Sequence, residues 1–82
     1  MLKIIFFAKI KDNLCRDFIE IEIETPCSVS DVRNYLKNEF SDHHHLFSED
    51  YATCAINHEI SNEKNMIRKG DEVAFFPPVT GG

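Results

Sequence analysis

The last residues of the chain are the ones whose types and order could support chemistry. Two of its three glycines are Gly81 and Gly82, the final pair. Glycine usually serves a turn or a helix end, where a positive φ is needed, but a final pair has no turn to complete. Two residues without side chains would instead form a thin strand that can enter a narrow tunnel in another protein. A frayed terminus is the alternative explanation for Gly-Gly alone.

The carboxylate of Gly82 is the group that such a strand would present. It is ionised at neutral pH, and an ionised carboxylate is a poor acyl donor because oxide is a very poor leaving group. Its use as a carrier therefore requires prior activation, for example as an acyl-phosphate or an acyl-adenylate. The chain has no glycine-rich phosphate-binding loop, so we expect it to be the substrate of that step and not its catalyst.

The residues just before the glycine pair favour an extended arm. Two consecutive prolines forbid helix, and the β-branched residues Val79 and Thr80 keep the backbone extended. From Pro78 to Gly82 the arm reaches at most about 17 Å, at 3.3–3.6 Å per residue. We expect a globular domain over residues 1–76 and a flexible C-terminal tail over 77–82. The residues expected to insert into a partner are Pro77, Pro78, Val79, Thr80 and Gly81.

Histidine and cysteine are the other residue types with chemical potential. Three consecutive histidines, His43–His45, point in different directions on a helix or a strand, and no C-x-x-C or H-x-x-x-H spacing supports zinc. We therefore predict no metal site and a solvated polar loop over 41–50. Cys15, Cys27 and Cys54 are an odd number without close spacing. They suit a reducing cytosol better than a disulfide framework.

The composition restricts the class of partner and the compartment. Nine basic and fourteen acidic residues give a formal net charge of −5, which argues against nucleic acid and is compatible with a basic protein surface. The longest apolar run, Ile4 to Ala8, is too short to span a membrane. The N-terminus lacks the pattern of a signal peptide, so we expect a cytoplasmic protein.

Two strands are predicted in the first third of the chain. Leu2 to Ile10 is rich in β-forming residues, and Phe18 to Thr25 alternates isoleucine with glutamate, as a half-buried strand does. The core-facing residues of the first strand are expected to be Leu2, Ile4, Phe6, Ala8 and Ile10.

One amphipathic helix follows. Ser28 is a candidate N-cap with Asp31 three residues on, and apolar residues recur at helical spacing through Phe40. The remaining predicted elements are a short strand over 52–57, a return strand from Ile60, a hydrophobic plug at 66–67 and a last strand over 72–76.

This order of elements predicts an α+β domain with one main helix packed across a mixed sheet. If the first and last strands are neighbours, the tail leaves from the middle of the sheet. By alternation, Ile5, Phe7 and Phe76 would then form an apolar patch on the open side, with Lys3 and Lys9 at its rim. An apolar patch on so small a domain favours a partner interface.

The C-terminal run from Gly70 to Gly82, GDEVAFFPPVTGG, closely resembles the C-terminus of the small subunits of molybdopterin synthases. These are sulfur carriers with the ubiquitin-like β-grasp fold. The run from Ile4 to Ile10 resembles the first strand of the family, residues 28–33 its helix start and residues 55–57 its central strand and turn. Only the segment 41–51 has no counterpart in the resemblance.

The resemblance implies a role in molybdenum cofactor biosynthesis. An E1-like adenylyltransferase would use ATP to adenylate the carboxylate of Gly82, and a sulfur-donating enzyme would convert it to a thiocarboxylate. The tail would then deliver sulfur to a cyclic pyranopterin monophosphate in the large catalytic subunit. The resemblance also implies a heterotetramer of two small and two large subunits. The chain would bind no cofactor and have no active site of its own.

The rival interpretations keep the tail but change its use. The chain could carry sulfur for thiamine synthesis or tRNA thiolation, although such carriers lack the Phe-Phe-Pro-Pro-Val-Thr run. It could be a ubiquitin-like modifier joined through Gly82 to lysines of other proteins. It could also be an interaction module whose tail is inert.

Overall fold

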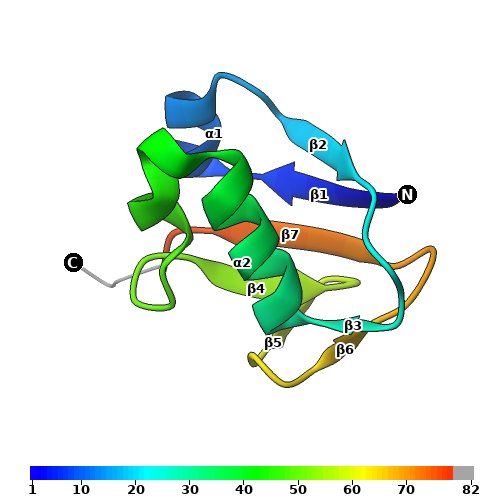
Figure 1. Cartoon of the computed structure of the whole chain (residues 1–82). Helices are drawn as coiled ribbons and strands as arrows, with labels where there is room; N and C mark the ends of the chain where they lie inside the picture. The colour runs from blue at the N-terminus through cyan, green and yellow to red at the C-terminus, as the bar shows by residue number, and fades with distance from the viewer. Residues whose placement is uncertain (79–82) are drawn as a thin grey trace.

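Five strands form one sheet in the computed structural model, which describes residues 1–78 (Figure 1). They are β1 (Leu2–Phe6), β2 (Phe18–Ile21), β4 (Thr53–Ile56), β5 (Glu59–Ser61) and β7 (Glu72–Phe76). Their order is β2-β1-β7-β4-β5, with β1 parallel to β7 and the other neighbours antiparallel. The sheet is therefore mixed, as predicted. The last strand lies in its middle beside the first, which meets the condition set for a tail that leaves from the middle of the sheet.

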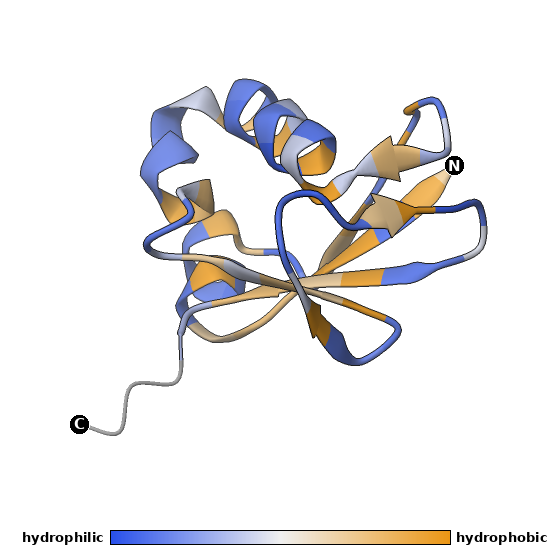
Figure 2. Ribbon diagram, turned by 90° about the horizontal axis from the view of Figure 1, so that it is seen from below, coloured by the Kyte–Doolittle hydropathy of each residue, from blue (hydrophilic) through white to orange (hydrophobic). Residues whose placement is uncertain are grey.

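The main helix, α2 (Val29–Glu39), lies across one face of this sheet (Figure 1). It begins with a capping box in which Ser28 Oγ accepts from the Asp31 backbone N–H and Asp31 Oδ2 accepts from the Ser28 N–H, both at 3.0 Å. Figure 2 shows its hydrophobic side turned toward the strands. The predicted helix and the α+β class are thus confirmed. Its fully buried apolar residues are Val29, Val32 and Leu36.

The predicted hydrophobic plug is a short strand. β6 (Met66–Ile67) pairs antiparallel with β3 (Cys27–Ser28), and the two form a separate two-stranded sheet. Ile67 is fully buried, whereas Met66 is 48% exposed. The pair fixes the start of α2, since Ser28 is both the end of β3 and the N-cap of the helix.

The predicted first strand over Leu2 to Ile10 is too long. The strand ends at Phe6, and residues Ala8–Leu14 form a short helix, α1. Ile10 and Leu14, four residues apart, are the buried residues of this helix. Ile10 therefore reaches the core from a helix, whereas Ala8 is exposed. Apolar residues still alternate in the sequence beyond Phe6, but from Ala8 onward the buried residues follow helical spacing.

The predicted polar loop over residues 41–50 is also wrong in part. Residues Ser41–Phe47 form the 3₁₀ segment η1, and its last two residues, Leu46 and Phe47, are buried. The Phe47 ring lies 5.8 Å from that of Phe6 and 5.9 Å from that of Phe75, centroid to centroid. The burial of Phe47 in this aromatic cluster stabilises a helical segment over residues 41–47, although the average polarity of these residues favours a loop.

Arg33 holds this segment to the helix, although it lies on the buried side of α2 with only 4% of its surface exposed. Its Nε and Nη2 donate to the two carboxylate oxygens of Glu63 at 2.8 and 2.7 Å. Its Nη1 donates to the carbonyl oxygens of Phe47, Ser48 and Ala52 at 2.8, 3.1 and 2.9 Å. The guanidinium thus provides hydrogen-bond donors to carbonyl oxygens at the end of η1 and in the connection to β4.

Within residues 1–78, none of the helices combines the length and the apolar character that crossing a membrane requires.

Candidate interaction site on the open face of the sheet

The face of the sheet opposite α2 carries a row of apolar residues. Residues paired across a ladder point to the same side, so the register can be followed from strand to strand. Ile5 pairs with Phe18 on one side and with Ala74 on the other, and Ala74 continues through Ala55 to Ile60. The row therefore spans all five strands of the sheet.

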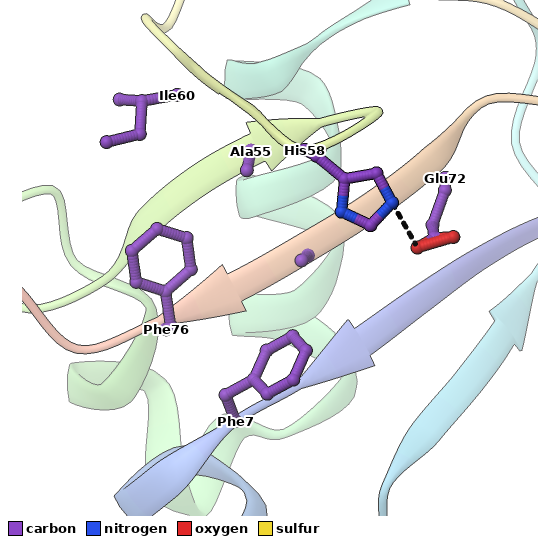
Figure 3. A pocket seen from close by; sticks show the side chains of 7 residues that line it. Phe7, Ala55, His58, Ile60, Glu72 and Phe76 are labelled. Atoms are coloured by element: carbon purple, nitrogen blue, oxygen red, sulfur yellow. Dashed lines mark ion pairs between the residues drawn. The ribbon is translucent and has the colours of Figure 1, made fainter.

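Two phenylalanines extend this row at the carboxyl ends of the central strands. Phe7 directly follows β1, is 49% exposed, and its N–H donates to the Phe75 carbonyl oxygen at 3.2 Å. Phe76 is the last residue of β7 and is half-buried. Their rings flank one side of a shallow hollow (Figure 3). Its lining residues are Phe7, Ala55, His58, Ile60, Glu72, Ala74 and Phe76.

The size and lining of this hollow favour a protein partner over a small molecule. Its volume is about 220 Å³, below the range of about 300–1,000 Å³ that is usual for small-molecule sites. Ile60 is 77% exposed and Phe18 is 45% exposed, so large apolar side chains are exposed to solvent on this face. Such an exposed patch with a shallow central hollow is typical of a surface that docks another protein.

A histidine and a glutamate lie at one end of the hollow. His58 Nε2 lies 3.7 Å from Glu72 Oε2 (Figure 3). Lys3 pairs with Glu72 across the β1–β7 ladder, but its Nζ lies over the Phe18 ring, 4.4 Å from the centroid. The lysine thus covers the far end of the apolar row.

A hydrogen-bond network holds the backbone beside Glu72. Asn57 Oδ1 accepts from the Glu72 N–H at 2.9 Å, and Asn57 Nδ2 donates to Asp71 Oδ1 at 3.0 Å. Asp71 Oδ2 in turn accepts from the Arg68 N–H at 2.7 Å. The hydrogen bond from the Arg68 backbone, followed by that from Asn57, lowers the pKa of Asp71. The β4–β5 turn and the start of β7 are thereby joined.

The structure places the predicted patch as follows. Ile5, Phe7 and Phe76 all belong to the open face; Phe7 and Phe76 line the hollow, while Ile5 lies in the apolar row beside it. Lys3 shares this face. Lys9 was expected on the first strand, but it belongs to α1. Whether a partner binds here remains a prediction.

Sequence reasoning missed the contribution of the β4–β5 hairpin. Ile60 and His58 line the hollow, yet neither was expected at the interface. The pairing of Ala55 with Ile60 could have been inferred from a two-residue turn at 57–58, because such a turn fixes the register of a hairpin.

The predicted tail begins where the described part of the chain ends. Pro77 is half-buried and Pro78 exposed, directly after the central strand β7. The predictions for Val79, Thr80, Gly81 and Gly82 lie outside the described residues. What the structure does place is the point of departure, which is adjacent to the hollow through Phe76.

The histidines and cysteines are not gathered into a site within the part of the chain that the structure describes. There, no three side chains of the metal-binding types come together in a way that could hold an ion. His44 and His45 are exposed on η1. Cys27 and Cys54 are buried and Cys15 is exposed, and all three thiols are free.

Comparison with known sequences places these features in a family context. The model of the ThiS family matches residues 4–82. The molybdopterin synthase sulfur carrier subunit of Escherichia coli (strain K12) is 36% identical over 83 aligned positions, and that of Haemophilus influenzae is 32% identical over 82. In both pairs the similarity covers 100% of each chain.

Solved structures give the same fold. SAMP1 from Haloferax volcanii has a TM-score of 0.80 at 22% identity, covering 99% of this chain and 98% of that one. The Pyrococcus furiosus protein assigned as molybdopterin converting factor, subunit 1, has a TM-score of 0.74 at 25% identity, with 95% and 97% covered. Subunits 1 and 2 of molybdopterin-converting factor from Helicobacter pylori were solved as a complex, which matches with a TM-score of 0.67 at 22% identity over 99% and 97%. The architecture is the ubiquitin-like β-grasp.

Proposed function

The chain belongs to the ThiS family, and from that premise we propose that it is the sulfur-carrying small subunit of a molybdopterin synthase. The observation that carries this proposal is the end-to-end similarity to two carrier subunits of that name, at 36% and 32% identity. The exposed apolar face beside the start of the tail supports it, because a carrier must dock before it can deliver.

The proposed chemistry takes place at the carbonyl carbon of Gly82. An E1-like adenylyltransferase joins the carboxylate to the AMP part of ATP and releases pyrophosphate. Hydrosulfide supplied by a donor enzyme then attacks the carbonyl carbon, a carbon–sulfur bond forms as the bond to the AMP oxygen breaks, AMP leaves, and a thiocarboxylate remains. Its sulfur is transferred to the cyclic pyranopterin monophosphate, and water returns an oxygen to the carbonyl carbon, which regenerates the carboxylate.

The proposed role of the folded domain is to position the tail. The apolar row and the hollow dock against the large catalytic subunit, in a heterotetramer of two small and two large subunits. Docking makes the delivery of sulfur effectively intramolecular, and this alone can supply several kcal/mol toward the transition state. Acid–base catalysis comes from the large subunit, because the chain carries no titratable side chain after Glu72.

Removal of Gly82 tests the proposal directly. With purified large subunit, activating enzyme, ATP and sulfur donor, we expect the truncated chain to form no molybdopterin while its circular dichroism and unfolding midpoint stay those of the full chain. The fold should persist because Gly82 has no side chain to pack. Molybdopterin formation by the truncated chain would contradict the mechanism. Co-purification with a large subunit of another pathway, or covalent adducts on lysines, would favour the rival carriers or a protein modifier.

A further inference from the structure

The β4–β5 turn holds a histidine in a left-handed backbone conformation, which is uncommon for residues other than glycine. Asn57 and His58 have φ of 50° and 71°, so both are left-handed, as in the two-residue turn that normally prefers Asn-Gly. Asparagine tolerates this region well, but a residue with a full side chain at the second position is strained relative to glycine. Strain of this kind is found preferentially where a side chain has a function.

The imidazole of His58 stands at the rim of the hollow and is available to a partner. Its side chain is 85% exposed and that of Glu72 is 45% exposed. The distance of 3.7 Å between His58 Nε2 and Glu72 Oε2 exceeds the 2.7–3.2 Å of a direct hydrogen bond. Figure 3 shows the two side chains facing each other across this gap. Both groups therefore keep hydrogen-bonding capacity for a third group.

The surroundings leave the Glu72 carboxylate without a strong cationic partner. Within residues 1–78, no lysine or arginine nitrogen lies within 4.0 Å of it. Lys3, its cross-strand neighbour, lies over Phe18 instead. Asp71 is engaged by Arg68 and Asn57, and the adjacent Glu59 adds negative charge beside the turn. The rim thus attracts a positive group.

We propose that His58 and Glu72 together receive an arginine side chain of the large subunit and so determine the specificity of docking. This inference rests on the proposed function. A guanidinium group is planar and carries several donors, so it can contact the Glu72 carboxylate and a ring nitrogen of His58 at once. The chain's net charge of −5 favours a cationic group on the facing surface, and a partner seated over the adjacent apolar hollow would exclude water from the contact.

Four variants of the full chain test this proposal against the purified large subunit by titration calorimetry. Glu72→Gln removes the charge, and we expect it to weaken binding about tenfold and to reduce its salt dependence. His58→Gly relaxes the turn and removes the imidazole, and we expect about a fivefold loss. His58→Asn keeps a residue suited to the turn and should lose affinity in the same way. Cys15→Gly is the matched control, because Cys15 also has a left-handed φ, 55°, but does not line the hollow; its affinity should stay within about twofold.

A double-mutant cycle tests whether one cation contacts both His58 and Glu72. If one cation contacts both residues, the loss for His58→Gly with Glu72→Gln together will be clearly smaller than the product of the single losses. Purely multiplicative losses, or single variants that bind within twofold of wild type, would overturn the shared site. Failure of the wild-type chain to bind the large subunit at all would overturn the proposed function instead.

Discussion

Cys54 shows how burial controls the chemistry of a single residue. Its side chain is 1% exposed in the middle of β4. Burial raises the pKa of the Cys54 thiol to about 12, and the opposing charge of Arg33 offsets this only in part. Burial, followed by the nearby charge of Asp31, also raises the pKa of Cys27. Neither thiol is suited to carry sulfur as a thiolate at neutral pH.

The titration of Cys54 predicts how stability depends on alkaline pH. Its pKa rises from an ordinary value of 9.0 to about 12 on folding, so between these limits the unfolded thiol loses its proton first. The unfolded state then binds fewer protons, and the free energy of unfolding falls as the pH rises through this window. Below pH 9 the contribution is fully present. Urea unfolding at a series of pH values should show a steeper fall for wild type than for Cys54→Ala; equal slopes would contradict the assignment.

Phe76 ends β7 and lines the hollow on the open face, directly before the proposed tail. Phe76→Glu places a charge in the hollow, and we expect it to weaken binding of the large subunit by at least about 2 kcal/mol, as for other buried aromatic anchors. Its effect on folding should be small, because the side chain is only half-buried. Calorimetric titration measures the affinity and urea unfolding supplies the control. Unchanged affinity would show that docking uses another surface.

Residue positions on this face were partly predictable. Alternation along β1 and β7 was enough to place Ile5 and Phe76 opposite the core, because a strand has a strict two-residue period. His58 was not predictable, since its role depends on a turn conformation and on the distant residue Glu72. Arg33 could have been noticed, because a charge interrupts the apolar stripe of the helix between Val32 and Leu36.

At the scale of elements, the local sequence was enough to predict a helix or strand where it contains the residues that begin and end that element. α2 starts at a capping box, and β7 starts after a turn and ends before Pro77, so both were placed nearly to the residue. α1 and η1 were missed because their boundaries are set by tertiary burial. Ile10 and Phe47 fill the core from segments whose local patterns suggest a strand and a loop.

Arg33 connects α2 to the end of η1 and to the segment after it. The loss of stability when Arg33 is removed measures the strength of this connection. Arg33→Ala leaves the carbonyl groups of Phe47 and Ala52 without their buried donor and Glu63 without its ion pair. We expect a loss of about 3–5 kcal/mol in the free energy of unfolding, as for other broken buried pairs. Urea unfolding followed by circular dichroism measures it.

The matched change at the other end of the pair separates the two contributions. Glu63→Gln keeps an amide oxygen as an acceptor, and the Glu63 side chain is 27% exposed. We expect a smaller loss of about 1–3 kcal/mol. A loss below 1 kcal/mol for Arg33→Ala would mean that water replaces the guanidinium without cost.

At the scale of the whole molecule, the core and the proposed docking face lie on opposite sides of one sheet. α2 and the aromatic cluster occupy one side of the sheet, and the apolar row occupies the other. The proposed tail follows β7, the central strand, which is hydrogen-bonded on both edges. The last described residues, Pro77 and Pro78, therefore directly follow a strand that is held on both sides. The fold class was predicted from the sequence. The departure from the middle of the sheet was expected only if the first and last strands were neighbours, and the extent of the face required the register of all five strands.

Intact-mass analysis of the chain isolated from cells that make molybdopterin tests the central claim most directly. The account predicts a species in which one oxygen is replaced by sulfur, with fragmentation placing the change at Gly82. The same species should form from the purified chain with activating enzyme, ATP and sulfur donor. A chain that remains an ordinary carboxylate under both conditions would contradict the account.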